Sequence, residues 1–150
     1  MTDEEFAIVK AHPRKGWEML RESGGVSEEG LDVCLHHHER MDGTGYPDKL
    51  SGEALTLLAR MGSVCDVYDA ITSDRCYKKG WEPAESIHKM AEWKDGHFDE
   101  TVFHAFVKTI GIYPNGTLLK LESGRLGLVI EQSAKSLTTP IVKVFFFDTC

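Results

Sequence analysis

Histidines are concentrated in two short segments, at His12 and in the run His36-His37-His38. Neutral imidazole is the commonest metal ligand near physiological pH. Because adjacent helical residues point about 100° apart, a pair of histidines at a helix end can be directed at two neighbouring ions. An isolated triplet is more often a solvated run that ends a helix, and a lone His12 is more often a capping or packing residue. The other motifs therefore have to decide between a metal site and a solvated surface.

Asp66 and Asp69 are three residues apart in an apolar stretch, so on a helix they share a face. Carboxylates in such surroundings are costly to bury unless they are paired or bound to metal. The structural alternative, which is about as frequent, is an ion pair with Arg60 or Arg75. Arg75 and Lys78 follow on a loop, where an arginine can hold a phosphate with two hydrogen bonds and a lysine adds a point charge. Taken alone, two such basic residues usually just solvate a surface.

The remaining histidines, His88, His97 and His104, have no clear partners in the sequence. We interpret all three as structural residues.

Local start and stop signals predict six helices. Thr2 and Glu5 form a capping box, Pro13 can open the second helix, and Ser27 and Asp99 can cap two others. The predicted helices span roughly residues 3–12, 13–23, 28–39, 55–71, 83–93 and 100–110. The second helix offers Trp17, Met19 and Leu20 as core candidates. The segment 42–47 is dense in turn-forming residues and is predicted to be a loop.

After residue 112 the sequence changes from helical patterns to short β patterns. Strands are predicted at about 118–121, 126–131 and 141–146, with Ser123-Gly124 as a hairpin turn between the first two. The predicted fold class is therefore mainly α, with a helical body over residues 1–112 and a small antiparallel β appendage over residues 113–150.

Composition excludes several classes of protein. The net charge of −7 argues against binding to a nucleic-acid polymer, since affinity for phosphate backbones comes mainly from Lys and Arg. Residues 111–150 carry four basic against three acidic side chains, so residues 1–110 hold a net −8. If this acidic part binds a phosphate ester, bound cations are the obvious means of attracting it.

The segments that target proteins to membranes or to secretion are not evident. No apolar run reaches the roughly 18 residues that a membrane span needs, and the first residues are acidic, unlike a signal peptide. The cysteines form no closely spaced pair, which fits reduced thiols and predicts a cytoplasmic location. They are Cys34, Cys65, Cys76 and Cys150.

Together the motifs resemble the HD-GYP family. Residues 37–47, His-His-Glu-Arg-Met-Asp-Gly-Thr-Gly-Tyr-Pro, look like its defining HHExxDGxGYP stretch, and we call residues 42–47 within it the signature loop. Residues 12–16 resemble its HPxxG element, residues 66–78 resemble its DVYDAxTSxRxYK segment, and residues 96–99 resemble its late Gly…Phe-Asp turn, with Glu100 in place of the usual proline. The likeness covers residues 3 to about 110, and a chance match to three ordered motifs is improbable.

The resemblance implies an HD-type helical bundle that hydrolyses cyclic di-GMP with two or three divalent ions, iron or manganese. His12, His37, His38 and Asp66 would be metal ligands. Asp69 would act at the catalytic centre, orienting the metal site or contacting the substrate. The implied substrate-binding residues are Arg75, Lys78, Gly43, Gly45, Tyr46 and Pro47.

The implied partners of such a domain are cyclic di-GMP, an upstream sensor or receiver domain and, in some assemblies, a second copy of the chain.

One departure from the family pattern bears on activity. The family's namesake His-Asp pair and a nearby Lys precede the HPxxG element, and none of residues 1–11 is a His. We therefore expect this chain alone to be inactive, as a truncated enzyme. The alternative is a non-catalytic HD-GYP-derived module that senses the dinucleotide or docks a partner. A plain helical domain with an adventitious His site is the third and least favoured interpretation, because the Gly-Tyr-Pro spacing matches.

Overall fold

The computed structural model describes residues 2–76, 78–133 and 135–145; of Lys94 it describes the backbone but not the side chain. The predictions made for Tyr77, for the end of the third strand at Phe146 and for Cys150 lie outside the described residues.

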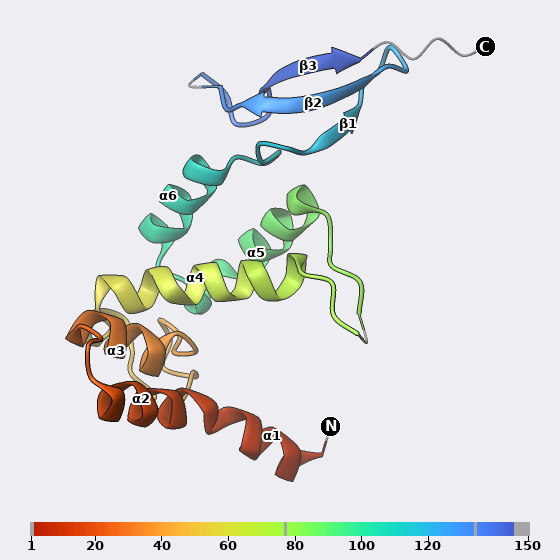
Figure 1. The fold of residues 1–150 in the computed structure, drawn as a ribbon. Coiled ribbons are helices and arrows are strands. Elements are labelled where there is room, and N and C mark those ends of the chain that lie inside the picture. The colour runs from red at the N-terminus through yellow and green to blue at the C-terminus, as the bar shows by residue number, and fades with distance from the viewer. Residues whose placement is uncertain (1, 77, 134, 146–150) are drawn as a thin grey trace.

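Six α-helices account for about half of the described residues, and the mainly α fold class is confirmed (Figure 1). Their bounds are α1 Asp3–Lys10, α2 His12–Ser23, α3 Glu28–His36, α4 Leu57–Thr72, α5 Pro83–His97 and α6 Glu100–Ile110. A single 3₁₀ turn, η1 Gly52–Ala54, precedes α4.

The predicted helix caps are present as hydrogen bonds. Thr2 and Glu5 bond reciprocally at the start of α1, the Ser27 hydroxyl accepts the Gly30 N–H at 3.2 Å, and the Asp99 carboxylate accepts the Val102 N–H at 3.0 Å. Each cap satisfies an N–H group that has no partner within its helix. These local signals therefore position the starts of α1, α3 and α6 correctly.

Helix α3 is shorter than predicted, ending at His36 instead of near Glu39. The Glu39 N–H bonds back to the His36 carbonyl at 2.9 Å, a tight i→i−3 bond that turns the chain. This turn carries Glu39 into the interior, where it is 1% exposed.

Helix α4 lies between α3 on one side and α5 and α6 on the other (Figure 1). Its buried residues pack with α5, α6 and the turn between them in one apolar cluster, consisting of Val64, Ile71, Met90, Phe98, Val102 and Phe103. Helix α2 is less buried than predicted: Met19 is 71% exposed, whereas Trp17 and Leu20 are half-buried. No described helix is both long and apolar enough to cross a membrane.

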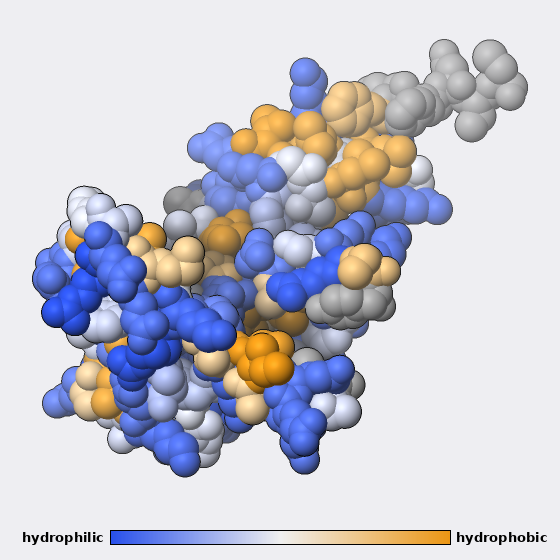
Figure 2. Space-filling model, turned by 60° about the horizontal axis from the view of Figure 1, so that its bottom comes forward, coloured by the Kyte–Doolittle hydropathy of each residue, from blue (hydrophilic) through white to orange (hydrophobic). Residues whose placement is uncertain are grey.

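The C-terminal segment forms a three-stranded antiparallel sheet in the order β1-β2-β3, as predicted. The strands are β1 Leu118–Lys120, β2 Leu126–Glu131 and β3 Ile141–Phe145. Gly124 has φ +80°, a conformation that suits glycine in the predicted hairpin turn. The sheet stands beyond the end of α6, far from α1 to α3 (Figure 1), and apolar surface gathers over it (Figure 2). The division of the chain at residue 112 falls between α6 and β1 and stays a prediction.

Candidate metal-binding site

Three of the four predicted metal ligands converge on one point. His12, at the start of α2, meets His37 and His38, in the turn after α3, and one ring nitrogen from each lies within 4.8 Å of the others. The closest pair is His12 Nε2 and His37 Nε2, 3.3 Å apart. The ring centroids of His37 and His38 are 4.2 Å apart. The chain thus brings together residues that are 25 positions apart in the sequence.

The hydrogen bonds of two of these rings determine which nitrogens face the cluster. His12 Nδ1 donates to the Val9 carbonyl at 2.7 Å, and His37 Nδ1 donates to the Cys34 carbonyl at 2.9 Å. A neutral imidazole with its proton on Nδ1 presents the Nε2 lone pair. Two lone pairs therefore face each other at 3.3 Å, an arrangement that a shared cation would stabilise. Backbone carbonyls commonly orient metal-binding histidines in this way.

The third ring is held in its neutral form by its surroundings. Burial first, and then the neighbouring His37, lower the pKa of His38 to about 4, while Asp66 acts in the opposite direction. Metal binding requires the neutral imidazole, so His38 needs no deprotonation at neutral pH. Asp66 lies outside the three-histidine group, with its Oδ2 atom 3.5 Å from His38 Nδ1.

His36 does not contribute to this cluster. Its two ring nitrogens contact carboxylates, Nδ1 with Asp32 at 2.7 Å and Nε2 with Asp48 at 3.2 Å. Arg14 pairs with the same Asp48 at 2.5 Å. This polar network connects α2, α3 and the residue after the signature loop, and it lies next to the His37-His38 turn in the sequence.

The signature loop is packed tightly against the histidine turn. Gly45 is buried, and a Cβ atom at this position would lie 2.4 Å from Glu39 Cα, which no side chain can tolerate. The Tyr46 ring packs on His38 with centroids 4.8 Å apart, and the Tyr46 N–H donates to the His38 carbonyl at 3.2 Å. Glu39 accepts the Asp48 N–H at 2.6 Å. Tyr46 of the loop therefore contacts both the ring and the backbone of His38.

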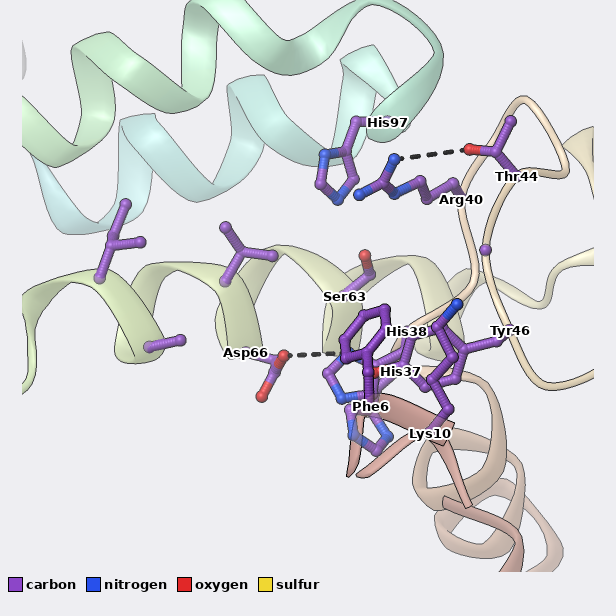
Figure 3. Close-up of a pocket in the computed structure, with 14 residues that line it drawn as sticks. Phe6, Lys10, His37, His38, Arg40, Thr44, Tyr46, Ser63, Asp66 and His97 are labelled. Atoms are coloured by element: carbon purple, nitrogen blue, oxygen red, sulfur yellow. Dashed lines mark hydrogen bonds and ion pairs between the residues drawn. The ribbon is translucent and has the colours of Figure 1, made fainter. Parts of the chain in front are cut away.

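A cleft of about 480 Å³ lies beside the cluster (Figure 3). It takes its walls from α1, the histidine turn, the signature loop, α4 and the turn before α6. The lining residues are Phe6, Lys10, His37, His38, Arg40, Thr44, Gly45, Tyr46, Ser63, Asp66, Val67, Ala70, Ile71 and His97. Of the signature-loop residues predicted to bind substrate, Gly45 and Tyr46 line the cleft, whereas Gly43 and Pro47 do not.

The structure adds cleft residues that the sequence analysis missed. His97, interpreted from the sequence as structural, lines the cleft opposite the histidine cluster, and Arg40 lies beside it (Figure 3). Lys10 also lines the cleft, with its Nζ atom 5.5 Å from the centre of the Tyr46 ring. Arg40 falls inside the HHExxDGxGYP stretch at an unspecified position, which is the one signal that could have indicated it.

The structure does not bring Asp69, Arg75 and Lys78 into this cleft, contrary to expectation. Asp69 is exposed and accepts the Ser73 hydroxyl at 3.2 Å. Arg75 and Lys78 close a small turn through paired backbone hydrogen bonds of 2.8 and 3.0 Å, on the loop that projects beyond α4 (Figure 1). The Lys78 ammonium lies 5.2 Å from the centre of the Trp81 ring.

Arg60, one of the suggested ion-pair partners of the two aspartates, instead pairs with Asp99. The Arg60 Nη1 atom lies 3.0 Å from Asp99 Oδ2, and both side chains are largely buried. The Asp66–Arg60 alternative is therefore wrong, and the Asp66 carboxylate stays directed at the histidines.

Comparison with known proteins places the chain in a family. Residues 1–102 match the HD domain family. The chain is 64% identical over 146 residues to a cyclic di-GMP phosphodiesterase of Pseudomonas aeruginosa, covering 97% of this chain and 35% of that protein. It is 48% identical over 109 residues to the cyclic di-GMP phosphodiesterase response regulator RpfG of Xanthomonas campestris, covering 72% of this chain and 29% of that protein. The chain thus spans about a third of these relatives.

Among solved structures, an HDG"Y"P protein from Bdellovibrio bacteriovorus has a similar fold. The TM-score is 0.60 at 21% sequence identity, and the match covers 73% of this chain and 34% of that protein. This likeness supports the HD-type arrangement of the helices.

Proposed function

Because the chain belongs to the HD domain family and carries the HD-GYP signature, we propose that it forms part of a metal-dependent phosphodiesterase that acts on cyclic di-GMP. The single observation that carries the proposal is the convergence of His12, His37 and His38 at the edge of a cleft. The names of the most similar relatives supply the substrate class.

The donor set fits a divalent ion. Three imidazoles can offer lone pairs to one point, and Asp66 adds a carboxylate 3.5 Å from His38. Imidazole and carboxylate together suit iron, manganese or zinc, and we favour iron or manganese, in a centre of two or three ions. A bound divalent ion would lower the pKa of a water molecule and neutralise phosphoryl oxygens.

The chain's own residues then bind and orient the substrate. Lys10 places a positive charge at the wall of the cleft, where it can meet a phosphate oxygen. The Tyr46 ring, fixed against His38, limits how a nucleotide enters. Phe6 and Ile71 contribute apolar surface to the same cleft, which reduces access of bulk water.

Arg75 and Lys78 take part in substrate binding only if the loop after α4 takes another arrangement in the assembled enzyme. Asp69 lies within α4, three residues after Asp66, so its proposed catalytic role does not depend on that loop. A cytoplasmic location, an upstream sensor or receiver domain and dimerisation are further parts of the proposal. A non-catalytic dinucleotide-binding module is the second candidate, favoured by the absence of a His-Asp sequence anywhere in the chain.

The proposal is tested first by metal content. The chain should bind at most one Mn²⁺ or Fe²⁺ ion, weakly, because within the part of the chain that the structure describes one group of three potential ligands converges. His37→Ala should abolish this binding, whereas His104→Ala, an exposed position on α6, should leave it unchanged. Retention of full metal binding by the His37 variant would refute the site.

Turnover is tested by comparing this chain with one extended upstream through a His-Asp pair. We expect the extended chain to hydrolyse cyclic di-GMP at an appreciable rate and the 150-residue chain not to do so. Binding without hydrolysis by both chains would favour the non-catalytic module instead. Equal activity from both would show that other residues complete the metal site.

A further inference from the structure

A second hollow adjoins the cleft and shares two of its residues. It has a volume of about 490 Å³ and is lined by Arg40, Asp42, Trp93, Asp95 and His97. Arg40 and His97 also line the cleft beside the histidine cluster. The two spaces are therefore neighbours with Arg40 and His97 in common, and we call the second one the side hollow.

The side hollow is built by two segments that are far apart in the sequence. The Met41 N–H bonds to the His97 carbonyl at 3.2 Å, and the Asp42 N–H bonds to the Gly96 carbonyl at 2.8 Å. These bonds fasten the signature loop to the end of α5. At Gly96, which has φ +78°, a Cβ atom would lie 2.9 Å from the Asp42 carboxylate, so the close approach requires glycine.

The charges in the side hollow do not suit a phosphate. Burial first, and then the nearby Arg40, lower the pKa of His97 to about 4 against the opposing effect of Asp42, so this imidazole is neutral at pH 7. Hydrogen bonds from the Thr44 hydroxyl and N–H lower the pKa of Asp42, which is therefore ionised. Among the described side chains, one guanidinium then lies with the carboxylates of Asp42 and Asp95, which gives this set no excess of positive charge.

The same groups suit a guanine base. Arginine pairs through two hydrogen bonds with the O6 and N7 acceptors of guanine. Carboxylates accept hydrogen bonds from the N–H groups on the opposite edge of guanine, whereas adenine presents an amino group where guanine presents O6. Trp93 is 39% exposed and offers an aromatic face for stacking. Among the described residues, Arg40 makes one side-chain hydrogen bond, a 3.5 Å contact to Thr44, so its remaining donors can face a ligand.

We propose that the side hollow is a guanine-binding subsite, in which Arg40 selects guanine over adenine and Trp93 stacks on the base. This inference rests on the proposed function, because it is the histidine cluster that places the phosphate of a cyclic dinucleotide in the adjoining cleft. Arg40 is then a specificity-determining residue, and Asp42 and Asp95 read the far edge of the same base.

The test measures binding, so it does not depend on turnover. Affinities of the 150-residue chain for cyclic di-GMP and cyclic di-AMP are measured by titration calorimetry in the presence of Mn²⁺. We expect the unmodified chain to prefer cyclic di-GMP. Arg40→Gln should reduce that preference about tenfold or more, because glutamine pairs with adenine instead. Trp93→Leu should weaken both ligands to a similar extent, by roughly tenfold, since stacking tolerates either base.

Arg21→Gln is the matched control, because Arg21 is exposed on α2 and packs over Trp17 at 4.9 Å. It should change neither affinity, and circular dichroism checks that every variant is folded. An equal loss of affinity for both dinucleotides in Arg40→Gln would indicate a phosphate contact and overturn the proposal. The proposal would also be overturned if Arg40→Gln lost no affinity, or if the unmodified chain bound neither dinucleotide. Selective binding that persists without hydrolysis in the extended chain would support the subsite while refuting the proposed phosphodiesterase activity.

Discussion

Asp99 connects two elements that build the cleft, so its replacement should destabilise the chain by more than the loss of a helix cap. Its Oδ1 atom accepts the Val102 N–H at 3.0 Å and caps α6, and its Oδ2 atom accepts Arg60 Nη1 at 3.0 Å from α4. The two side chains are only 16% and 19% exposed. Their pairing is therefore weakly screened by water, and it fixes the His97–Asp99 turn against α4.

The expected magnitude follows from these two bonds. A helix cap contributes about 1 kcal/mol, and a hydrogen bond to a charged partner contributes about 1.5–3 kcal/mol. Asp99→Ala should therefore lower the free energy of unfolding by about 2–4 kcal/mol. For a chain of this length that corresponds to a fall in Tm of about 10 °C. Asp99→Asn keeps the capping oxygen and should cost about half as much.

Ser27→Ala is the matched control, because the Ser27 hydroxyl caps α3 with a 3.2 Å bond and, being uncharged, forms no ion pair. It should cost about 1 kcal/mol. Urea unfolding followed by circular dichroism at pH 7 measures all three variants. If Asp99→Ala were no more destabilising than Ser27→Ala, the Arg60 contact would contribute nothing and the reasoning would be wrong.

The pH dependence of the same contact has a defined sign. The Val102 N–H, and then Arg60, lower the pKa of Asp99, while burial acts against them. The contribution of Asp99 is therefore fully present above the ordinary aspartate pKa, near 4. It is lost as the pH falls through the lowered pKa of the folded state. The stability difference between the unmodified chain and Asp99→Asn should narrow over that acid range.

Three further predictions concern the loop, the cleft and the sheet. Gly45→Ala should destabilise the chain and weaken Mn²⁺ binding, because its Cβ would meet backbone atoms of Glu39 and Arg40 at 2.4–2.5 Å. Gly127→Ala is the control: its Cβ would lie 3.5 Å from the nearest neighbouring atom, so it should lower the Tm only slightly in a thermal melt. Because the pKa of His97 is lowered to about 4 in the folded chain, His97 takes up its proton at a higher pH in the unfolded chain, and stability falls as the pH drops from about 6.5 to 4. His97→Gln should reduce this loss of stability in urea titrations. A variant ending at residue 112 should keep the Mn²⁺ binding of the whole chain, and loss of metal from that variant, if folded, would contradict the assignment of all ligands to the helical part.

The sequence predicted those features that depend on neighbouring residues. The caps at Thr2, Ser27 and Asp99 are contacts over three residues, and the hairpin at Gly124 needs only a positive φ. Convergence of His12 with the His37-His38 turn was also anticipated, but through the family resemblance, since no local rule relates residues 25 positions apart.

The features that the sequence did not predict depend on long-range packing. His97 reaches the cleft because backbone bonds from Met41 and Asp42 fasten the end of α5 to the signature loop. Those partners are more than 50 residues away in sequence. The position of the loop after α4 could not be predicted for a different reason. Arg75 and Lys78 bond to each other through their backbones, and nothing in their residue types indicates on which side of α4 the loop lies.

The three consecutive histidines have different roles because of where α3 ends. His36 is the last helical residue, and its ring bonds back to Asp32 one turn earlier. The turn that follows leaves the helical path, so His37 faces His12 and His38 faces Asp66. Had α3 continued to Glu39, that carboxylate would have stayed on the helix surface instead of reaching the Asp48 N–H. A metal site at this position therefore depends less on the number of histidines than on the tight bond from Glu39 to His36. That bond ends the helix between the ring that contacts Asp32 and Asp48 and the two rings that line the cleft.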